Sequence, residues 1–415
     1  MINKEINLNE IKDILNLNKE EIVVRGKSLL NFTKNGFPTK QHEDWKFIDL
    51  NKIISSKIPD LKFTNSFISE KINIDDIINL IPKDLLKNNY IISVNGIIES
   101  IEFNNEEKNK FEIIKKPDNL NFKTDTSLNS LNKALYLDYI KLLVKEDYKF
   151  KNPVIFINYT SPNIINTALN QRLDIVMEKN SSMSILDFNL NLSKNNFYNI
   201  YNNFILNEGS ILKNYKVDLN HNSNLYYSKS NIKLYKNSIS ENFIFSSGSE
   251  FSKNEVECNL LENFSSAFIN GVINLDNSKQ HEIRSKINHL SENTKSYQLI
   301  KCALKDQSKA VYQGKIFVDS VAQKTDGYQL SKAILLNDGT EFNGKPELEI
   351  YADDVKCSHG SSSGNLEDNK IFYLMTRGLN VNQAKKMLLD GYFLEVVEKI
   401  TDNNVKGIIK DLMQI

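Results

Sequence analysis

The pattern of apolar and polar positions changes at about Pro153. Beyond it, short runs rich in Ile, Phe, Val and Tyr alternate with polar residues, as in MSILDFNLNL and LYYSKSNIKLY. A period of two residues is typical of strands with one buried face. We therefore predict a mainly β core over residues 151–356.

Polar turn clusters separate these strands at regular intervals. The clusters centre on Ser181, Gly209, Ser238, Ser265 and Thr294, which lie 28, 29, 27 and 29 residues apart. A repeat of about 20 to 50 residues is the signature of a solenoid. Strands without helical spacers favour a β-helix, whose coils bury apolar faces only against one another and whose ends need covers. A stacked-strand sandwich and a chance alignment of Ser- and Asn-rich turns are the alternatives.

The segments on either side of this core carry helical patterns. Residues 1–150 are predicted to form a mainly helical domain, with a hairpin over 91–103 around Asn95–Gly96 and a helix over Leu128–Val144. Asn-Gly between two apolar runs favours a type I′ turn. Residues 357–415 are predicted to form a C-terminal helical domain.

Two helices in this C-terminal domain have clear end signals. Asn365 begins the first and Gly378 follows it, whereas Asn380 and Gln383 form the start of the second. The second helix carries one broad apolar stripe. It consists of Ala384, Leu388, Leu389, Tyr392, Phe393, Val396, Val397 and Ile400. Such a stripe indicates either a helix pair packed on itself or a surface that docks a partner.

Composition excludes several classes of protein. Lys+Arg and Asp+Glu both number 52, so the basic excess of a nucleic-acid binder is missing. No apolar run approaches the ~20 residues of a membrane-spanning helix. The N-terminus resembles neither a secretory signal nor a transit peptide. Because the three cysteines are far apart, we expect no disulfide framework and a reducing, cytoplasmic location.

Most catalytic motifs are absent, but Cys357–Ser358–His359 places two metal-binding side chains close together. The P-loop, GxGxxG, HExxH, GxSxG and CxxC patterns do not occur. On a strand, residues i and i+2 share a face. If Leu348–Val355 is a strand that continues into this segment, then Cys357, His359 and Asp353 lie on one face. Thiolate and imidazole ligands suit a soft metal such as iron, and an imidazolium would lower the pKa of the thiol. The alternative is a buried structural cysteine beside a hydrogen-bonded histidine.

The remaining cysteines and two of the other histidines are predicted to be structural. Cys258 and Cys302 lie in apolar strand contexts, where buried inert thiols are usual. His281 and His289 are eight residues apart, and we expect a turn between them. An iron–sulfur protein normally supplies about four thiolates per cluster. Three scattered cysteines cannot do so, which means that any cluster must be shared with another chain.

Several segments together resemble the SufD members of the SufB/SufD family of iron–sulfur cluster assembly proteins. The run PELEIYADDVKCSHGSSSG, followed by IFYLMTRGL, resembles the C-terminal signature of that family. AVYQGKIFVDSVAQKTDGYQLSKAILL and HEDWKF resemble two further family segments. The similarity is dense over residues 280–400 and thin between 60 and 270. After CSHG this chain has SSS, where the family more often has A-T-x. In the following segment it has TRG, where the family more often has SRG.

This resemblance implies a fold, partners and site residues. The fold would be a right-handed parallel β-helix with helical domains at both ends. The chain would be a non-catalytic scaffold subunit that pairs with a SufB-like paralogue, or with a second copy of itself in isolation. A SufC-like ATPase would bind its C-terminal helices, around Phe372, Tyr373, Arg377, Leu388, Tyr392 and Phe393. A cysteine desulfurase system would deliver sulfur indirectly. His359, with Cys357 beside it, would contribute to a transient iron or iron–sulfur site at the partner interface, and no cofactor would be bound permanently. Neither nucleic acid nor membrane is implied as a partner.

Three competing assignments remain. SufB resembles SufD over the same region, but it carries an EHEA-type motif where this chain has CSHG. A β-helix enzyme acting on polysaccharides would share the solenoid, although clustered carboxylates and a secretion signal are not evident. A cysteine-nucleophile enzyme would use Cys357 and His359, yet no third residue that orients them can be identified.

Overall fold

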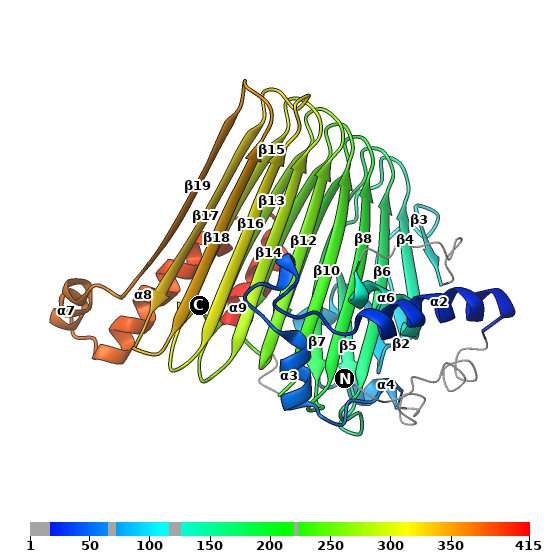
Figure 1. The fold of residues 1–415 in the computed structure, drawn as a ribbon, viewed down its shortest axis with the longest axis horizontal. Coiled ribbons are helices and arrows are strands. Elements are labelled where there is room, and N and C mark those ends of the chain that lie inside the picture. The colour runs from blue at the N-terminus through cyan, green and yellow to red at the C-terminus, as the bar shows by residue number, and fades with distance from the viewer. Residues whose placement is uncertain (1–16, 65–71, 116–125, 220–222) are drawn as a thin grey trace.

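The computed structural model describes residues 17–64, 72–115, 126–219 and 223–415. These residues form a long parallel β-solenoid with helices from both ends of the chain (Figure 1). Successive strands from β4 onward alternate between two sheets, so that each coil contributes one strand to each sheet. The predicted parallel β-helix with N- and C-terminal helices is therefore confirmed.

Sheet 1 has ten strands and sheet 2 has nine. In spatial order, sheet 1 contains β19 (Lys356–Gly364), β17 (Asp326–Leu335), β15 (Lys295–Leu304), β13 (Ser266–Leu275), β11 (Ile239–Ser246), β9 (Ile211–Asp218), β7 (Ser182–Asn191), β5 (Val154–Thr160), β1 (Asn89–Val94) and β2 (Ile97–Glu102). Sheet 2 contains β18 (Glu341–Ile350), β16 (Lys309–Val318), β14 (Gln280–His289), β12 (Phe251–Leu260), β10 (Leu225–Leu234), β8 (Phe197–Leu206), β6 (Ala168–Met177), β4 (Tyr139–Val144) and β3 (Phe111–Ile114).

Parallel register stacks equivalent residues of successive coils into columns that face the interior. In sheet 2 one such column runs through Phe204, Ile232, Cys258 and Ile287, all of them fully or almost fully buried. Each side chain in the column packs against its neighbours one coil away, as expected for a solenoid. The thiol of Cys258 therefore lies in an apolar column, which agrees with the prediction of a structural residue.

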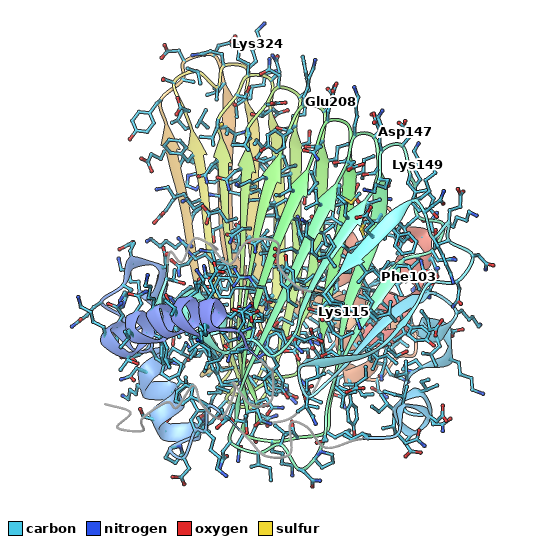
Figure 2. All side chains as sticks on the ribbon, turned by 90° about the vertical axis from the view of Figure 1, so that its right-hand side faces the viewer. Phe103, Lys115, Asp147, Lys149, Glu208 and Lys324 are labelled. Carbon is cyan, nitrogen blue, oxygen red and sulfur yellow. The ribbon has the colours of Figure 1, made fainter. Side chains whose placement is uncertain are left out.

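The turns explain the sequence period. The hydroxyls of Ser181, Ser210, Ser238 and Ser265 each donate to the carbonyl three residues earlier, at 2.6–2.7 Å. The residues at the tips of the turns adopt positive φ, as at Asn180 (55°) and at other positions on the same edge. Asn tolerates this conformation better than most residues, so asparagine takes the place of glycine, of which the chain has only 15, at many of these turns. Figure 2 shows Asp147, Glu208 and Lys324 along this edge.

Helices cover the outer face of each sheet. The nine described helical elements are α2 (Lys19–Asn35), η1 (Glu43–Trp45), α3 (Leu50–Lys57), α4 (Ile74–Ile78), α5 (Lys83–Leu86), α6 (Ser127–Leu135), α7 (Asp368–Thr376), α8 (Val381–Val397) and α9 (Asn403–Met413). Helices α2, α3 and α6 pack on sheet 2 around Phe197 and Tyr227. Helices α8 and α9 pack on sheet 1 around Tyr215 and Phe243. The apolar stripe of α8 therefore packs on a sheet, which neither sequence-based interpretation foresaw.

The structure corrects the predicted boundaries of the regions. The hairpin is confirmed, with φ of 53° at Asn95 and 91° at Gly96, but β1 also pairs in parallel with β5. The predicted helix over Leu128–Val144 ends at Leu135, and β4 follows it and pairs with β6. The sheets thus begin before residue 151, and β19 carries sheet 1 past residue 356. These segments form strands despite their helical pattern, because their side chains pack against the next coil.

The two ends of the solenoid differ. At the N-terminal end, Phe103, Phe111 and Phe150 form an aromatic cluster with ring centroids 4.6–5.9 Å apart, which packs against the interior (Figure 2). At the other end, β18 and β19 are the last strands of their sheets, and most of their residues are exposed or half-buried. Among the described residues, no strand pairs with their outer edges. The last coil is therefore open.

A buried lysine anchors the N-terminal segment to sheet 2. Lys253 is fully buried, and its Nζ donates to the Asp44 carbonyl oxygen at 2.6 Å and forms an ion pair with Glu282, which is equally buried. Nζ also lies 4.5 Å from the centre of the Trp45 ring. These contacts compensate for the cost of burying both charges. Trp45, 5% exposed, is therefore a packing anchor between this segment and sheet 2.

We expect Lys253→Met to lower the free energy of unfolding by about 3 to 5 kcal/mol, because Glu282 would be left buried without its counter-charge. Trp45 is the only tryptophan, so its fluorescence during urea unfolding reports the change directly. Lys179→Met is the control, because the Lys179–Glu208 pair is exposed and its removal should leave stability nearly unchanged. Equal stability of the Lys253 variant and the wild type would contradict this account.

Candidate functional site

Cys357 and His359 lie on β19, the last strand of sheet 1. In the parallel register, Cys357 is opposite Gly327 and His359 is opposite Gln329, both on β17. Gly327 and Gln329 belong to the buried inner face of β17. Because adjacent parallel strands keep the same facing, the two side chains share the inner face of the open coil, as predicted. His359 is exposed and Cys357 is half-buried.

The Cys357 thiol lies against the chain rather than free in solvent. It packs beside Ile316, Val318 and Ala352, and a Cβ atom placed on Gly327 would lie 3.3 Å from its Sγ. Burial raises the pKa of Cys357, a hydrogen bond from the Gly327 backbone opposes the rise, and the charge of Asp326 adds to it. The prediction that an imidazolium lowers the pKa of this thiol is therefore wrong for the free chain. The thiol is protonated at neutral pH.

The strand predicted over Leu348–Val355 ends early and does not continue into this motif. β18 ends at Ile350, and residues 351–355 make the turn that carries the chain from sheet 2 to sheet 1. Asp353 is exposed in that turn and does not share the face of Cys357 and His359. The chain also continues straight through Gly360 to Gly364 before α7 begins. The alternation in the sequence could not reveal the corner, because acidic residues occur in turns as well as in strands.

No further metal ligand completes the site within the described residues, where no group of three or more His, Cys, Asp or Glu side chains could hold a metal ion. Cys258 and Cys302 are completely buried in other coils, and burial raises the pKa of both thiols far above its usual range. The open coil thus presents one imidazole and one thiol. These two side chains are the right types for iron, but fewer than an iron–sulfur cluster needs.

His281 and His289 have structural environments. Both lie on β14, so the expected turn between them is wrong, and both face the interior. His281 Nε2 donates to the Ser249 carbonyl oxygen at 2.7 Å, and its Nδ1 is 2.8 Å from Ser246 Oγ. The ring nitrogens of His289 lie 2.7 and 2.9 Å from the hydroxyls of Thr294 and Ser296. All four ring nitrogens are satisfied, which leaves none for a metal.

The residues predicted to dock the ATPase divide into two groups. Phe372 and Tyr373 on α7 are 68% and 56% exposed, and the exposed Arg377 lies over the Tyr373 ring at 5.2 Å. Leu388 and Tyr392 on α8 are half-buried, and the backbone oxygen of Tyr392 accepts from Lys301 at 2.8 Å. Phe393 is 3% exposed and packs on sheet 1. The prediction that Phe393 belongs to the docking surface is therefore wrong.

A line of polar side chains lies beneath His359, and no motif in the sequence marks it. Gln298 and Gln329 are paired in register on β15 and β17, directly below His359 on β19. The two glutamines sit in the same triplet, Tyr-Gln-Leu, at residues 297–299 and 328–330. Aligning the coils on that triplet would have revealed that the position beneath His359 is polar in two successive coils.

Comparison with known proteins agrees with this architecture. Residues 158–392 match a family model described as "SUF system FeS cluster assembly, SufBD core domain". The iron–sulfur cluster assembly protein SufD of Escherichia coli is 39% identical over 125 residues, which is 30% of this chain and 30% of that protein. A SufBD family protein of Synechocystis is 26% identical over 69% of this chain and 65% of its own length. A protein of Arabidopsis thaliana named ABCI7, chloroplastic, is 24% identical over 93% of this chain and 86% of its own. In the described residues, no helix has the length and hydropathy needed to cross a membrane.

The two buried histidines predict a loss of stability in mild acid. Burial lowers the pKa of His281 and of His289 from 6.5 to about 4. Their folded-state pKa lies below the unfolded value, so the stabilising contribution is complete above pH 6.5 and is lost as the pH falls towards 4. We expect a decrease of about 2 kcal/mol per histidine in the free energy of unfolding between pH 7 and pH 4.5.

Urea unfolding followed by Trp45 fluorescence at several pH values measures this dependence. The double variant His281→Asn/His289→Asn is the comparison, because it lacks both titrating rings but retains hydrogen-bonding groups. Its stability should fall less steeply with acid. Parallel curves for the variant and the wild type would show that the histidines do not cause the dependence.

Proposed function

The chain belongs to the SufBD core family of the SUF iron–sulfur cluster assembly system, and we propose that it is the SufD-type, non-catalytic scaffold subunit of that system. A SufB-like paralogue covers its open last coil, and the nascent cluster forms at the seam as cargo rather than as a resident cofactor. A cysteine desulfurase system supplies the sulfur. The observation that carries the proposal is the open coil with Cys357 and His359 on its inner face.

The edges of the last coil support a strand-to-strand interface. An uncovered edge strand presents unpaired N–H and C=O groups that accept a strand from another chain. β18 carries Pro346 and several charged residues, which discourage pairing along that edge. β19, with the sequence KCSHGSSSG, has no proline and little charge. The paralogue therefore pairs along β19, and a second copy of this chain takes its place when the paralogue is missing.

The ligand count supports a shared cluster. His359 supplies an exposed imidazole, whereas the thiol of Cys357 must lose a proton before it can bind iron. The exposed His359 is therefore the first ligand and the half-buried Cys357 a secondary one. A cluster needs about four protein ligands, so the paralogue contributes the remainder. The CSHG motif distinguishes this subunit from its SufB-like partner.

The exposed side of α7 supports a docking site for the SufC-like ATPase. Phe372, Tyr373 and Met375 are 68%, 56% and 43% exposed on a nine-residue helix with only Ile371 buried. With Arg377 and Leu388 they form what we call the α7 surface. Exposed aromatic residues together with arginine are typical anchors of a protein interface.

We expect His359→Ala to leave folding unchanged but to reduce cluster formation about tenfold or more in the complex assembled with the paralogue and the ATPase. Disturbing a metal site commonly costs about 10- to 100-fold in affinity or activity. Iron and acid-labile sulfide per complex, measured after anaerobic reconstitution, test this. Ser358→Ala is the matched control, because Ser358 lies on the outer face of the same strand. Wild-type iron content in the His359 variant would refute the role of His359.

We expect Phe372→Asp to weaken ATPase binding about 30-fold, the effect of losing an anchor worth about 2 kcal/mol. Removing the chain from Asn380 onward would also uncover sheet 1, so a point variant is the sharper test. Titration calorimetry with the purified ATPase measures the affinity, and Leu30→Asp on α2, 72% exposed in the wild type, is the control. Unchanged affinity of the Phe372 variant would exclude the α7 surface.

A further inference from the structure

A column of polar side chains runs inside the last coils towards His359. Gln298 on β15, Gln329 on β17 and His359 on β19 are neighbours in register. Adjacent strands lie about 4.8 Å apart, so each side chain is next to the one above it. One coil lower, the same position holds the fully buried Ile269. Below Ile269 the position holds the buried Asn242 and Asn214, whose side chains are hydrogen-bonded to each other at 3.1 Å, so polar residues at this position in the lower coils are paired.

Gln329 is the least satisfied member of this column, since Gln298 lacks a partner only at its Nε2. It is 1% exposed, and neither its Nε2 nor its Oε1 has a hydrogen-bond partner. A buried amide without partners costs free energy that an apolar side chain of the same size would not. Packing alone therefore does not account for glutamine at this position.

The neighbours of Gln329 make room for its amide without bonding it. Oε1 of Gln298, below, accepts from the Tyr312 hydroxyl at 3.1 Å and also from the Ser285 hydroxyl. Gly314, across the interior, has no side chain, and a Cβ atom there would collide with Gln329 Oε1. Gln298 is thus hydrogen-bonded through its Oε1, whereas Gln329 has no partner at either amide atom and has His359 as its neighbour above.

Side chains on β17 and β19 already contact each other in the two adjacent columns. The hydroxyls of Ser331 and Ser361 are hydrogen-bonded at 2.9 Å, and Cys357 packs against Gly327. Between these contacts, the exposed imidazole of His359 is solvated by water in the free chain. Once a partner covers the coil, the imidazole loses that water, and its N–H then requires a protein acceptor.

We propose that Gln329 is a positioning residue for His359: in the complex, its side-chain amide oxygen accepts the N–H of one imidazole nitrogen. This contact fixes the tautomer and directs the other nitrogen, with its lone pair, towards the seam where iron binds. Histidine ligands are commonly oriented in this way by an acceptor behind them. The role of this contact in iron binding rests on the proposed function. The contact itself can be tested without assuming that function.

The test uses the chain labelled with ¹⁵N-histidine, assembled with unlabelled paralogue and ATPase and without iron. The imidazole ¹⁵N shifts of His359, assigned by comparison with His359→Ala, report its tautomer. We expect one dominant tautomer in the wild type and a mixture of both in Gln329→Met, which removes the amide at nearly constant volume. Gln329→Glu keeps an acceptor oxygen and should restore the single tautomer. If Gln329→Met and the wild type have the same His359 shifts, the proposal is overturned.

Gln298→Met is the matched control one coil lower, and it separates positioning from stability. It removes an amide oxygen that is hydrogen-bonded, so it should lower the urea midpoint and leave the tautomer of His359 unchanged. Gln329→Met removes an amide without partners, so its midpoint should be equal to or higher than that of the wild type. A lower midpoint for Gln329→Met with an unchanged tautomer would show a structural role only. If Gln329→Met fails to assemble, a mixture of tautomers in Gln329→Glu overturns the proposal.

Cluster formation in the same complexes distinguishes this inference from the proposed function. Gln329→Met should raise the iron(II) concentration that gives half-maximal cluster formation by about tenfold, and Gln329→Glu should restore it. If the His359→Ala complex forms clusters normally although Gln329→Met changes the tautomer of His359, the proposed function is refuted and the positioning role of Gln329 is retained. If His359→Ala abolishes cluster formation and Gln329→Met leaves the tautomer of His359 unchanged, the proposed function is retained and the positioning role of Gln329 is refuted.

Discussion

A parallel β-solenoid must satisfy the inner face and the backbone edges of its last coil, and this chain leaves both open at one end. Stacking against the next coil is what buries each apolar column. At the N-terminal end the aromatic cluster around Phe103 takes over this role. At the C-terminal end β18 and β19 have no such cover among the described residues. The position of Cys357 and His359 and the unprotected edge of β19 belong to this open coil, and the unpartnered amide of Gln329 lies directly beneath it.

The helices stabilise the solenoid from the sides and leave this end free. The N-terminal helices are fixed to sheet 2 through the buried Lys253–Glu282 pair and Trp45. Helix α8 is fixed to sheet 1 by its apolar stripe and by Lys301, which pairs with Glu395 at 2.6 Å and donates to the Tyr392 backbone. Helix α7 follows β19 directly and has one buried residue. The helices of the described residues thus leave the open coil and the α7 surface exposed, and these two surfaces are adjacent in the chain.

Much of this arrangement could be predicted from local chemistry. The turn period is visible in the sequence because the same serine hydroxyl closes successive turns, as at Ser181 and Ser238. The Asn95–Gly96 hairpin and the start of α8 at Asn380 depend on neighbouring residues only, and both were predicted correctly. The family resemblance located the motif on β19, and the period of two residues placed Cys357 and His359 on one face.

The rest depended on contacts between coils that are distant in sequence. The segment after Leu135 has a helical pattern but forms a strand, because β6 offers it a pairing edge. Phe393 looks like an interface residue until sheet 1 is placed beneath it. Gln329 looks like an ordinary strand residue until the register sets it under His359. In each case the deciding partner lies in another coil or another element, which local periodicity cannot reveal.

Hydrogen exchange of the backbone amides at 356–364 tests the central claim most directly, because it reports on the edge of β19 without requiring iron. The account predicts that these amides exchange quickly in the free chain and become protected when the SufB-like paralogue binds, whereas β2 and β3 at the closed end are unaffected. A stable complex with the paralogue in which 356–364 exchange as fast as in the free chain would contradict it.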